Sequence, residues 1–138
     1  MPNASSNSLR VAVAGVTGYA GAELARILLH HPRLSAPPLF LGREGAEETV
    51  RLIDLHPALY GAPNANAAQV VPFSWDTLTK EGVNILFLAL PHEQSRELVP
   101  IALSHNIRVV DLSAAWRLQH ADNRAIYKLH DANPDTCN

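Results

Sequence analysis

The residues from Gly15 to Gly21 (GVTGYAG) carry glycines at the spacing G-x-x-G-x-x-G and constrain the fold more than any other part of the sequence. They follow a short apolar run at residues 9–14 (LRVAVA) and precede residues 20–31 (AGAELARILLHH), which are rich in good helix formers. The apolar run predicts a strand buried on both faces, because it carries β-branched residues and stops at a glycine. A strand, a glycine turn and a helix in this order predict the start of a βαβ unit.

The predicted helix ends before Pro32, because proline cannot continue a helix. Its apolar stripe consists of Leu24, Ile27, Leu28 and His31. After this helix we expect a short strand at 39–41, a short helix at 44–55, a loop at 56–68 and a brief strand at 69–73. A helix then runs from the N-cap Ser74 to Lys80 and is ended by Gly82, and a strand follows at 84–90. The last two elements are a helix at 94–105, which Pro100 kinks or shortens, and a strand at 108–112. This alternation predicts an α/β fold with a doubly wound parallel sheet, covered on both faces.

Each glycine of the turn has a separate task if the turn binds a nucleotide. Gly15 permits the tight turn after the strand, Gly18 lets the backbone approach a pyrophosphate, and Gly21 lets the helix pack close to the sheet. The helix N-terminus then offers free N–H groups and the positive end of its dipole to the phosphate. We expect nucleotide binding; the alternative is a glycine-rich loop that holds no ligand.

The end of the second strand bears on which dinucleotide is bound. Sites that prefer NAD place an Asp or Glu about 20 residues further on, where it bonds the ribose hydroxyls. Here Gly42, Arg43 and Glu44 follow Leu41, where we expect the strand to end. Arg43 can offer its guanidinium to a 2′-phosphate, which favours NADP(H). Two alternatives stay open: Glu44 takes this place instead, or Arg43 is only a solvated cation.

Polar residues also follow the two later strands, at the edge of the sheet where ligands bind in this fold class. Residues 91–93 (PHE) follow the first of these strands, and residues 113–118 (SAAWRL) follow the second. His92 and Glu93 are acid–base groups by type. The alternative is that both residues form the first turn of a helix and cap its N-terminus.

The remaining polar and aromatic residues receive structural interpretations. Asp111 lies within a buried strand and needs a partner, for which Ser113 and Arg117 are candidates. Trp75 and Trp116 are interpreted as core or interface residues. The histidines at 30, 31, 56, 105, 120 and 130 lack ligand spacing, so we interpret them as surface or packing residues and expect no metal.

Composition excludes several other classes. The chain has 138 residues, with 47% hydrophobic and 17% charged residues, which argues against intrinsic disorder. The net charge of -2 without a basic stripe argues against nucleic acid as a partner. A single cysteine excludes an internal disulfide framework. No apolar run approaches the roughly 20 residues of a membrane helix, and Met1–Ser8 lacks a secretory h-region, so we expect a cytoplasmic protein without membrane contact.

Four segments occur in an order that is similar to a known enzyme family. They are residues 15–24 (GVTGYAGAEL), 52–57 (LIDLHP), 87–95 (FLALPHEQS) and 109–118 (VVDLSAAWRL). Over residues 9–128 the chain resembles N-acetyl-gamma-glutamyl-phosphate reductase, which is related to aspartate-semialdehyde dehydrogenase. Many folds share the glycine turn, whereas the last segment is much more specific.

The resemblance implies an NADP-binding Rossmann domain, which we place at residues 9–138. Residues 1–8 are predicted to be a flexible leader, because their low apolar content cannot offset the entropy of ordering. Members of this family reduce N-acetylglutamyl 5-phosphate to the 5-semialdehyde in arginine biosynthesis. A cysteine thiolate forms a thioester that NADPH reduces. The resemblance also implies a small-molecule acyl phosphate substrate and a homo-oligomer for the full-length enzyme.

The resemblance assigns cofactor binding to the glycine turn, to the cation after the second strand, and to residues after the later strands. These residues are Gly15, Thr17, Gly18, Tyr19, Ala20, Gly21, Arg43, Pro91, His92 and Ser113. The family nucleophile lies in an Asn-Pro-Gly-Cys segment, whereas residues 133–138 read NPDTCN, so we do not expect Cys137 to be the nucleophile. We therefore expect this chain to lack the catalytic α+β domain, to expose an apolar face where that domain docks, and to be inactive alone.

Three alternatives remain. One is a free-standing NADP-binding regulatory module, and another is an oxidoreductase of the aspartate-semialdehyde dehydrogenase type. The third is a short-chain dehydrogenase, whose glycine turn is similar. That class needs a Tyr-x-x-x-Lys pair, but Glu23, Asn64 and Asp131 stand four residues after the three tyrosines.

Overall fold

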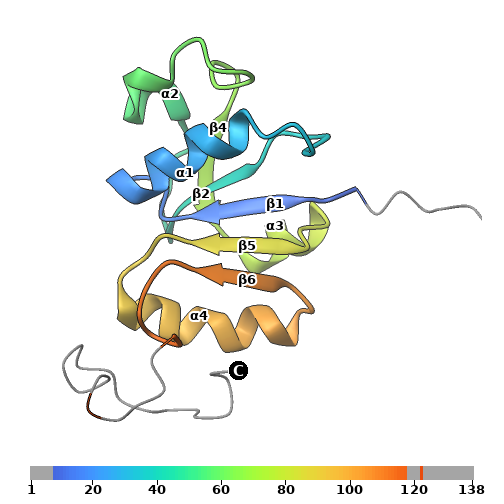
Figure 1. Ribbon diagram of the computed structural model, residues 1–138, viewed down its shortest axis with the longest axis vertical. Helices are drawn as coiled ribbons and strands as arrows, with labels where there is room; N and C mark the ends of the chain where they lie inside the picture. The colour runs from blue at the N-terminus through green and yellow to red at the C-terminus, as the bar shows by residue number, and fades with distance from the viewer. Residues whose placement is uncertain (1–7, 118–121, 123–138) are drawn as a thin grey trace, which may run out of the picture.

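The computed structural model describes residues 8–117 and residue 122, and these form one sheet with helices on both faces (Figure 1). The elements are β1 (Val11–Ala14), α1 (Tyr19–Leu29), β2 (Leu39–Glu44), β3 (Val50–Arg51), α2 (Leu52–Leu55), the 3-10 helix η1 (Pro57–Leu59), β4 (Gln69–Phe73), α3 (Trp75–Lys80), β5 (Ile85–Leu88), α4 (His92–Ser104) and β6 (Arg108–Asp111). The leader and the C-terminal segment that contains Cys137 lie outside the described residues.

The sheet has the strand order β3-β4-β2-β1-β5-β6. Every pairing is parallel except that of β3, which runs antiparallel to β4. The chain builds outward from β1 to β2 and β4 and then returns to the other side of β1 to add β5 and β6. The strand order therefore reverses at β1, which is the point where doubly wound sheets bind ligands. The predicted fold class is confirmed, with one antiparallel edge strand in addition.

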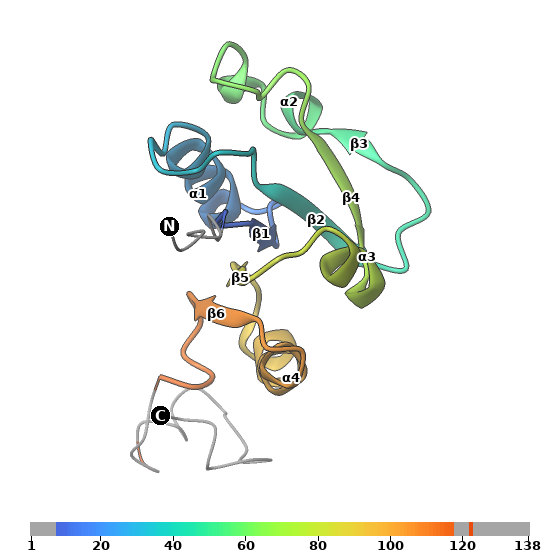
Figure 2. The same cartoon turned by 90° about the vertical axis from the view of Figure 1, so that its right-hand side faces the viewer.

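Helices lie on the two faces of this sheet (Figure 2), and a hydrophobic core lies on each face. On the face that we call the α1 face, Val11 and Val13 of β1 pack with α1, α2 and η1. On the opposite α4 face, Ala12 and Ala14 pack with α3 and α4. All four residues of β1 are buried, which confirms the prediction that this strand is covered on both sides.

The region after β2 differs from the prediction. A helix at residues 44–55 was expected, but β2 continues to Glu44 and only Leu52–Leu55 is helical. Between them, Val50 pairs with Val70 and Arg51 pairs with Gln69 of β4. This pairing between distant segments overrides the helical composition of residues 44–51.

Two helices also differ in detail. In α1 the buried residues are Gly21, Ala25, Leu28 and Leu29. Ile27 is 49% exposed and His31 is exposed, so the predicted stripe was wrong at these two positions. Helix α4 begins at His92 and continues through Pro100 to Ser104. It is therefore neither shortened nor interrupted at the proline.

The α1 face of β5 and β6 is less covered than the rest of the sheet. The register places Phe87 and Val110 beside Val13 on this face. Val110 is 46% exposed and Leu112, just after β6, is 43% exposed. An exposed apolar face was expected, and the identity of what docks there stays a prediction. None of the helices in the described part of the chain has the length and apolar character needed to cross a membrane.

Candidate cofactor-binding site

A cavity of about 500 Å³ opens beyond the carboxyl ends of β1, β2 and β5. Its volume lies within the range of small-molecule and cofactor sites, and its place is the switch point of the sheet. The lining includes Gly15, Thr17, Gly18, Arg43 and Pro91, all of which the sequence predicted as cofactor-binding residues. The fold therefore brings residues from three separate segments of the chain to one cavity.

Gly15 and Gly21 are restricted to glycine by backbone contacts. Gly15 has a φ of +85°, and a Cβ there would lie 2.2 Å from the carbonyl oxygen of Ala89. The positive φ agrees with the predicted role of Gly15 in a tight turn, and the contact shows in addition that the turn passes directly beside Ala89, just after β5. A Cβ on Gly21 would lie 2.2 Å from the carbonyl oxygen of Gly15. Gly21 thus lets α1 pack against the glycine turn itself, whereas the prediction placed this close contact at the sheet.

Gly18 is different because space lies beside it. A Cβ at this position would meet only the carbonyl oxygen of Gly15, at 3.9 Å. Gly18 is the N-cap residue of α1 and has no side chain to accept hydrogen bonds from the first turn. These backbone N–H groups and the helix dipole are available to an anion in the cavity, and no acidic residue stands in the first turn.

The first turn of α1 contains the remaining predicted residues of this motif. Tyr19 is 98% exposed, and neither Tyr19, Ala20 nor Gly21 is part of the cavity lining. Their backbone N–H groups, rather than their side chains, stay the predicted contacts to a phosphate.

Arg43 and Glu44 both lie on the last part of β2 and both line the cavity. The strand had been expected to end at Leu41, but it continues through these two residues after a register shift against β4. Both side chains are exposed. Among the described residues Arg43 has no ion-pair partner, so its charge is available to a ligand. The sequence left open whether Arg43 or Glu44 takes the place near the ribose, and both residues line the same cavity.

His92 and Ser113 are not part of the cavity lining, although His92 directly follows Pro91, which is; both residues form hydrogen bonds in the loop after β6. Nδ1 of His92 accepts a hydrogen bond from the backbone N–H of Ala114 at 3.1 Å. The Ser113 hydroxyl donates to Asp111, which also accepts the Ser113 N–H, both at 2.9 Å. The expectation that Ser113 partners Asp111 is confirmed. His92 begins α4, and its imidazole contacts this neighbouring loop instead of capping its own helix.

Several cavity residues were not predicted from the sequence. Phe73 lies at the end of β4, and Gln94, Glu97 and Leu98 lie on one face of α4. Their i, i+3, i+4 spacing marks one side of a helix, which is the signal that could have found them. His56 was interpreted as a surface or packing residue, but its Nε2 lies 2.5 Å from the carbonyl oxygen of Val16 in the glycine turn.

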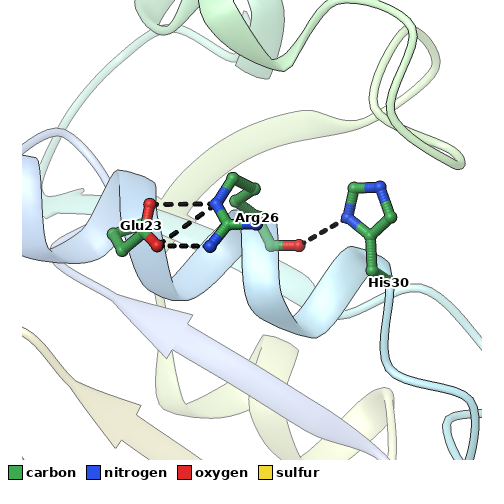
Figure 3. A network of polar contacts seen from close by, with 3 residues as sticks. All are labelled: Glu23, Arg26 and His30. Atoms are coloured by element: carbon green, nitrogen blue, oxygen red, sulfur yellow. Dashed lines mark hydrogen bonds and ion pairs between the residues drawn. The ribbon is translucent and has the colours of Figure 1, made fainter.

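The outer surface of α1 carries a separate polar network (Figure 3). Arg26 donates to both carboxylate oxygens of Glu23, and Nδ1 of His30 lies 2.8 Å from the Arg26 carbonyl oxygen. The hydrogen bond from Arg26 lowers the pKa of the Glu23 carboxyl. These groups are exposed and lie outside the cavity lining, so they belong to the solvated face of the helix.

The other candidate residues are structural. Trp75 packs edge-to-face on Phe73 and stacks on His105, and Trp116 donates from Nε1 to the Ser95 carbonyl oxygen at 3.3 Å. Both side chains are partly buried and pack against the core of the α4 face, which agrees with their interpretation as core or interface residues. Within the described part of the chain, no group of His, Cys, Asp and Glu is arranged to hold a metal ion.

The chain is similar to known reductases over most of its length. The chain is 42% identical to a [LysW]-L-2-aminoadipate/[LysW]-L-glutamate phosphate reductase of Sulfolobus acidocaldarius, over 88% of this chain and 32% of that protein. It is 34% identical to an N-acetyl-gamma-glutamyl-phosphate reductase of Pectobacterium carotovorum, over 92% of this chain and 37% of that protein. The chain thus spans about a third of the length of these relatives.

A solved structure has the same fold. Aspartate semialdehyde dehydrogenase II of Vibrio cholerae aligns with a TM-score of 0.55 and 25% identity, over 80% of this chain and 32% of that one. Residues 10–138 match the family described as semialdehyde dehydrogenase, NAD binding domain. The chain is an NAD(P)-binding domain of the Rossmann type, and it belongs to the semialdehyde dehydrogenase family.

Proposed function

We propose that this chain is the NADP(H)-binding part of a reductase that converts an acyl phosphate to an aldehyde in amino-acid biosynthesis, with N-acetylglutamyl 5-phosphate as substrate. The observation that carries the proposal is the cavity at the switch point, where the glycine turn and Arg43 face the same space. The open position beside Gly18 fits a pyrophosphate, and Arg43, which has no ion-pair partner among residues 8–117, fits a 2′-phosphate. NADPH would supply the hydride when it is bound there.

The roles of the chain's own residues follow from this placement. Gly15 and Gly21 fix the turn, and the first-turn N–H groups of α1 receive the pyrophosphate. Pro91 and the loop that His92 holds flank the nicotinamide end, beyond β5 and β6. The nucleophile, the catalytic base and the substrate-binding groups are assigned to parts of the enzyme other than the described residues.

A second substrate is favoured by a specific observation, since the relatives with 40–42% identity are named as LysW-linked phosphate reductases. Both candidate reactions reduce an acyl phosphate, so the cofactor site would be the same. The discriminating assay follows NADPH oxidation by the whole enzyme with N-acetylglutamyl 5-phosphate and with a LysW-linked aminoadipyl phosphate. Turnover of the first supports the arginine assignment, turnover of only the second moves the enzyme to the LysW class, and turnover of neither contradicts the proposed function.

A further inference from the structure

His56 is connected to the glycine turn by a hydrogen bond that spans 40 positions of sequence. Its Nε2 atom lies 2.5 Å from the carbonyl oxygen of Val16. The imidazole is half-buried, and Val16 is fully buried. Because a carbonyl oxygen only accepts hydrogen bonds, Nε2 must carry the hydrogen. The ring therefore donates to the turn in its neutral Nε2–H tautomer and also when it is protonated.

The segment that carries His56 is firmly held against the α1 face. Leu52 and Leu59, on either side of His56, are 0% and 4% exposed and belong to the same core as Val16. The backbone of His56 donates to the Leu52 carbonyl and accepts from the Leu59 N–H, both at 2.9 Å. The imidazole is thus presented to the turn from a fixed position.

The hydrogen bond has a consequence for the next residue because a peptide unit is planar and trans. In such a unit the carbonyl of Val16 and the N–H of Thr17 point in opposite directions. Val16 directs its carbonyl oxygen to His56, on the α1 face. The N–H of Thr17 is therefore directed away from His56, and Thr17 lines the cavity. The Gly18 N–H bonds the Gly15 carbonyl across this turn, so the His56 contact is the hydrogen bond that fixes the direction of the central Val16–Thr17 peptide.

We propose that His56 is a positioning residue for pyrophosphate binding, which holds the Val16–Thr17 peptide so that the Thr17 N–H faces the bound phosphate. The proposal rests on the proposed function, since it concerns the same dinucleotide site. It assigns a role to the LIDLHP segment, which contributes no residue to the cavity lining. His56 acts through the backbone and does not itself contact the cofactor.

The test measures binding of three ligands by titration calorimetry to the wild-type protein, His56→Phe and His56→Gln. NADPH and 2′-phospho-ADP-ribose contain the pyrophosphate, whereas adenosine 2′-monophosphate carries neither of its phosphates. Loss of one hydrogen bond that orders the turn is expected to weaken the two pyrophosphate ligands by roughly three- to tenfold in His56→Phe. Binding of adenosine 2′-monophosphate should be unchanged. Glutamine can donate an N–H, so His56→Gln should recover part of the loss.

The matched control is His30→Phe, which removes an exposed imidazole that lies at hydrogen-bond distance from the Arg26 carbonyl oxygen on α1, outside the cavity lining. It should bind all three ligands as the wild type does. Equal weakening of all three ligands in His56→Phe, or wild-type affinity for all three, would overturn the positioning role. Failure of the wild type to bind either pyrophosphate ligand would instead contradict the proposed function.

A measurement on the wild type does not depend on how the variants fold. The ring nitrogens of His56 can be observed by 15N NMR near neutral pH. The structure requires a hydrogen on Nε2. An unprotonated Nε2 in the folded protein would overturn the proposal even if neither variant could be purified.

Discussion

Replacing Gly18 with serine should separate cofactor binding from stability. A Cβ at this position has its nearest contact at 3.9 Å, so the side chain fits without moving the turn. The backbone has φ -89° and ψ 174°, an extended conformation that serine adopts readily as an N-cap. The new hydroxyl would accept a hydrogen bond from the first turn of α1. We expect the free energy of unfolding to rise by a few tenths of a kcal/mol, because serine is a better N-cap than glycine.

The same change should impair binding of NADPH. The serine side chain occupies the space beside the turn and engages an N–H group that the pyrophosphate would otherwise use. Losing one hydrogen bond to a charged phosphate costs about 1.5–3 kcal/mol, which corresponds to roughly a 10- to 150-fold increase in Kd.

Both quantities can be measured on one preparation, by urea unfolding and by fluorescence titration with NADPH. Wild-type affinity in a Gly18→Ser protein of normal stability would refute the reasoning, since it would mean that the pyrophosphate does not approach Gly18. A parallel loss of stability and affinity would also contradict it, because the space that the structure leaves at Gly18 would then be absent.

Three further outcomes follow from the same structure. Gly21→Ala should destabilise the protein by about 1–3 kcal/mol in urea unfolding despite alanine's better helix propensity, because the new Cβ would overlap the backbone of the glycine turn at 2.2 Å. Ser95→Ala should leave stability unchanged or raise it by up to about 1 kcal/mol, since among the described residues the buried Ser95 hydroxyl has no hydrogen-bond partner; a clear loss in thermal unfolding would reveal one. Arg26→Met should raise the pKa of Glu23 in an NMR titration, because the lowered pKa comes from the Arg26 hydrogen bond. In the wild type, the stabilisation from ionised Glu23 is present above the unfolded-state pKa of this group and is lost as the pH falls through its folded-state pKa. The stability of the variant should not show this contribution to its dependence on acidic pH.

The parts of the fold that local signals specify were predicted closely. The strand at 69–73 and the helix that Ser74 caps agree with β4 and α3 residue by residue, and the Ser74 hydroxyl accepts the Thr77 N–H. Gly82, with a φ of +67°, follows that helix as expected. Caps, turn glycines and short apolar runs act within a few residues of the chain, so their consequences can be worked out from the sequence.

Features that depend on distant segments could not be predicted in this way. The strand β3 exists because Val50 and Arg51 pair with β4, which lies beyond an intervening loop. The contacts of His56 with Val16 and of His92 with Ala114 join positions 40 and 22 residues apart. A single histidine has no sequence periodicity from which such a distant partner could be predicted. The sequence therefore located the cavity through its glycine turn, but not the residues that hold the surrounding loops.

The most direct test of the central claim is a paired titration of this protein with NADPH and NADH, carried out on the wild type and on Arg43→Ala. Arg43 lines the cavity at the end of β2 and should contact the 2′-phosphate that only NADPH carries. The account predicts that the wild type binds NADPH more tightly than NADH, and that Arg43→Ala loses about tenfold or more in NADPH affinity with little change for NADH. Equal affinity for the two cofactors in the wild type, or an NADPH preference that survives in Arg43→Ala, would contradict it.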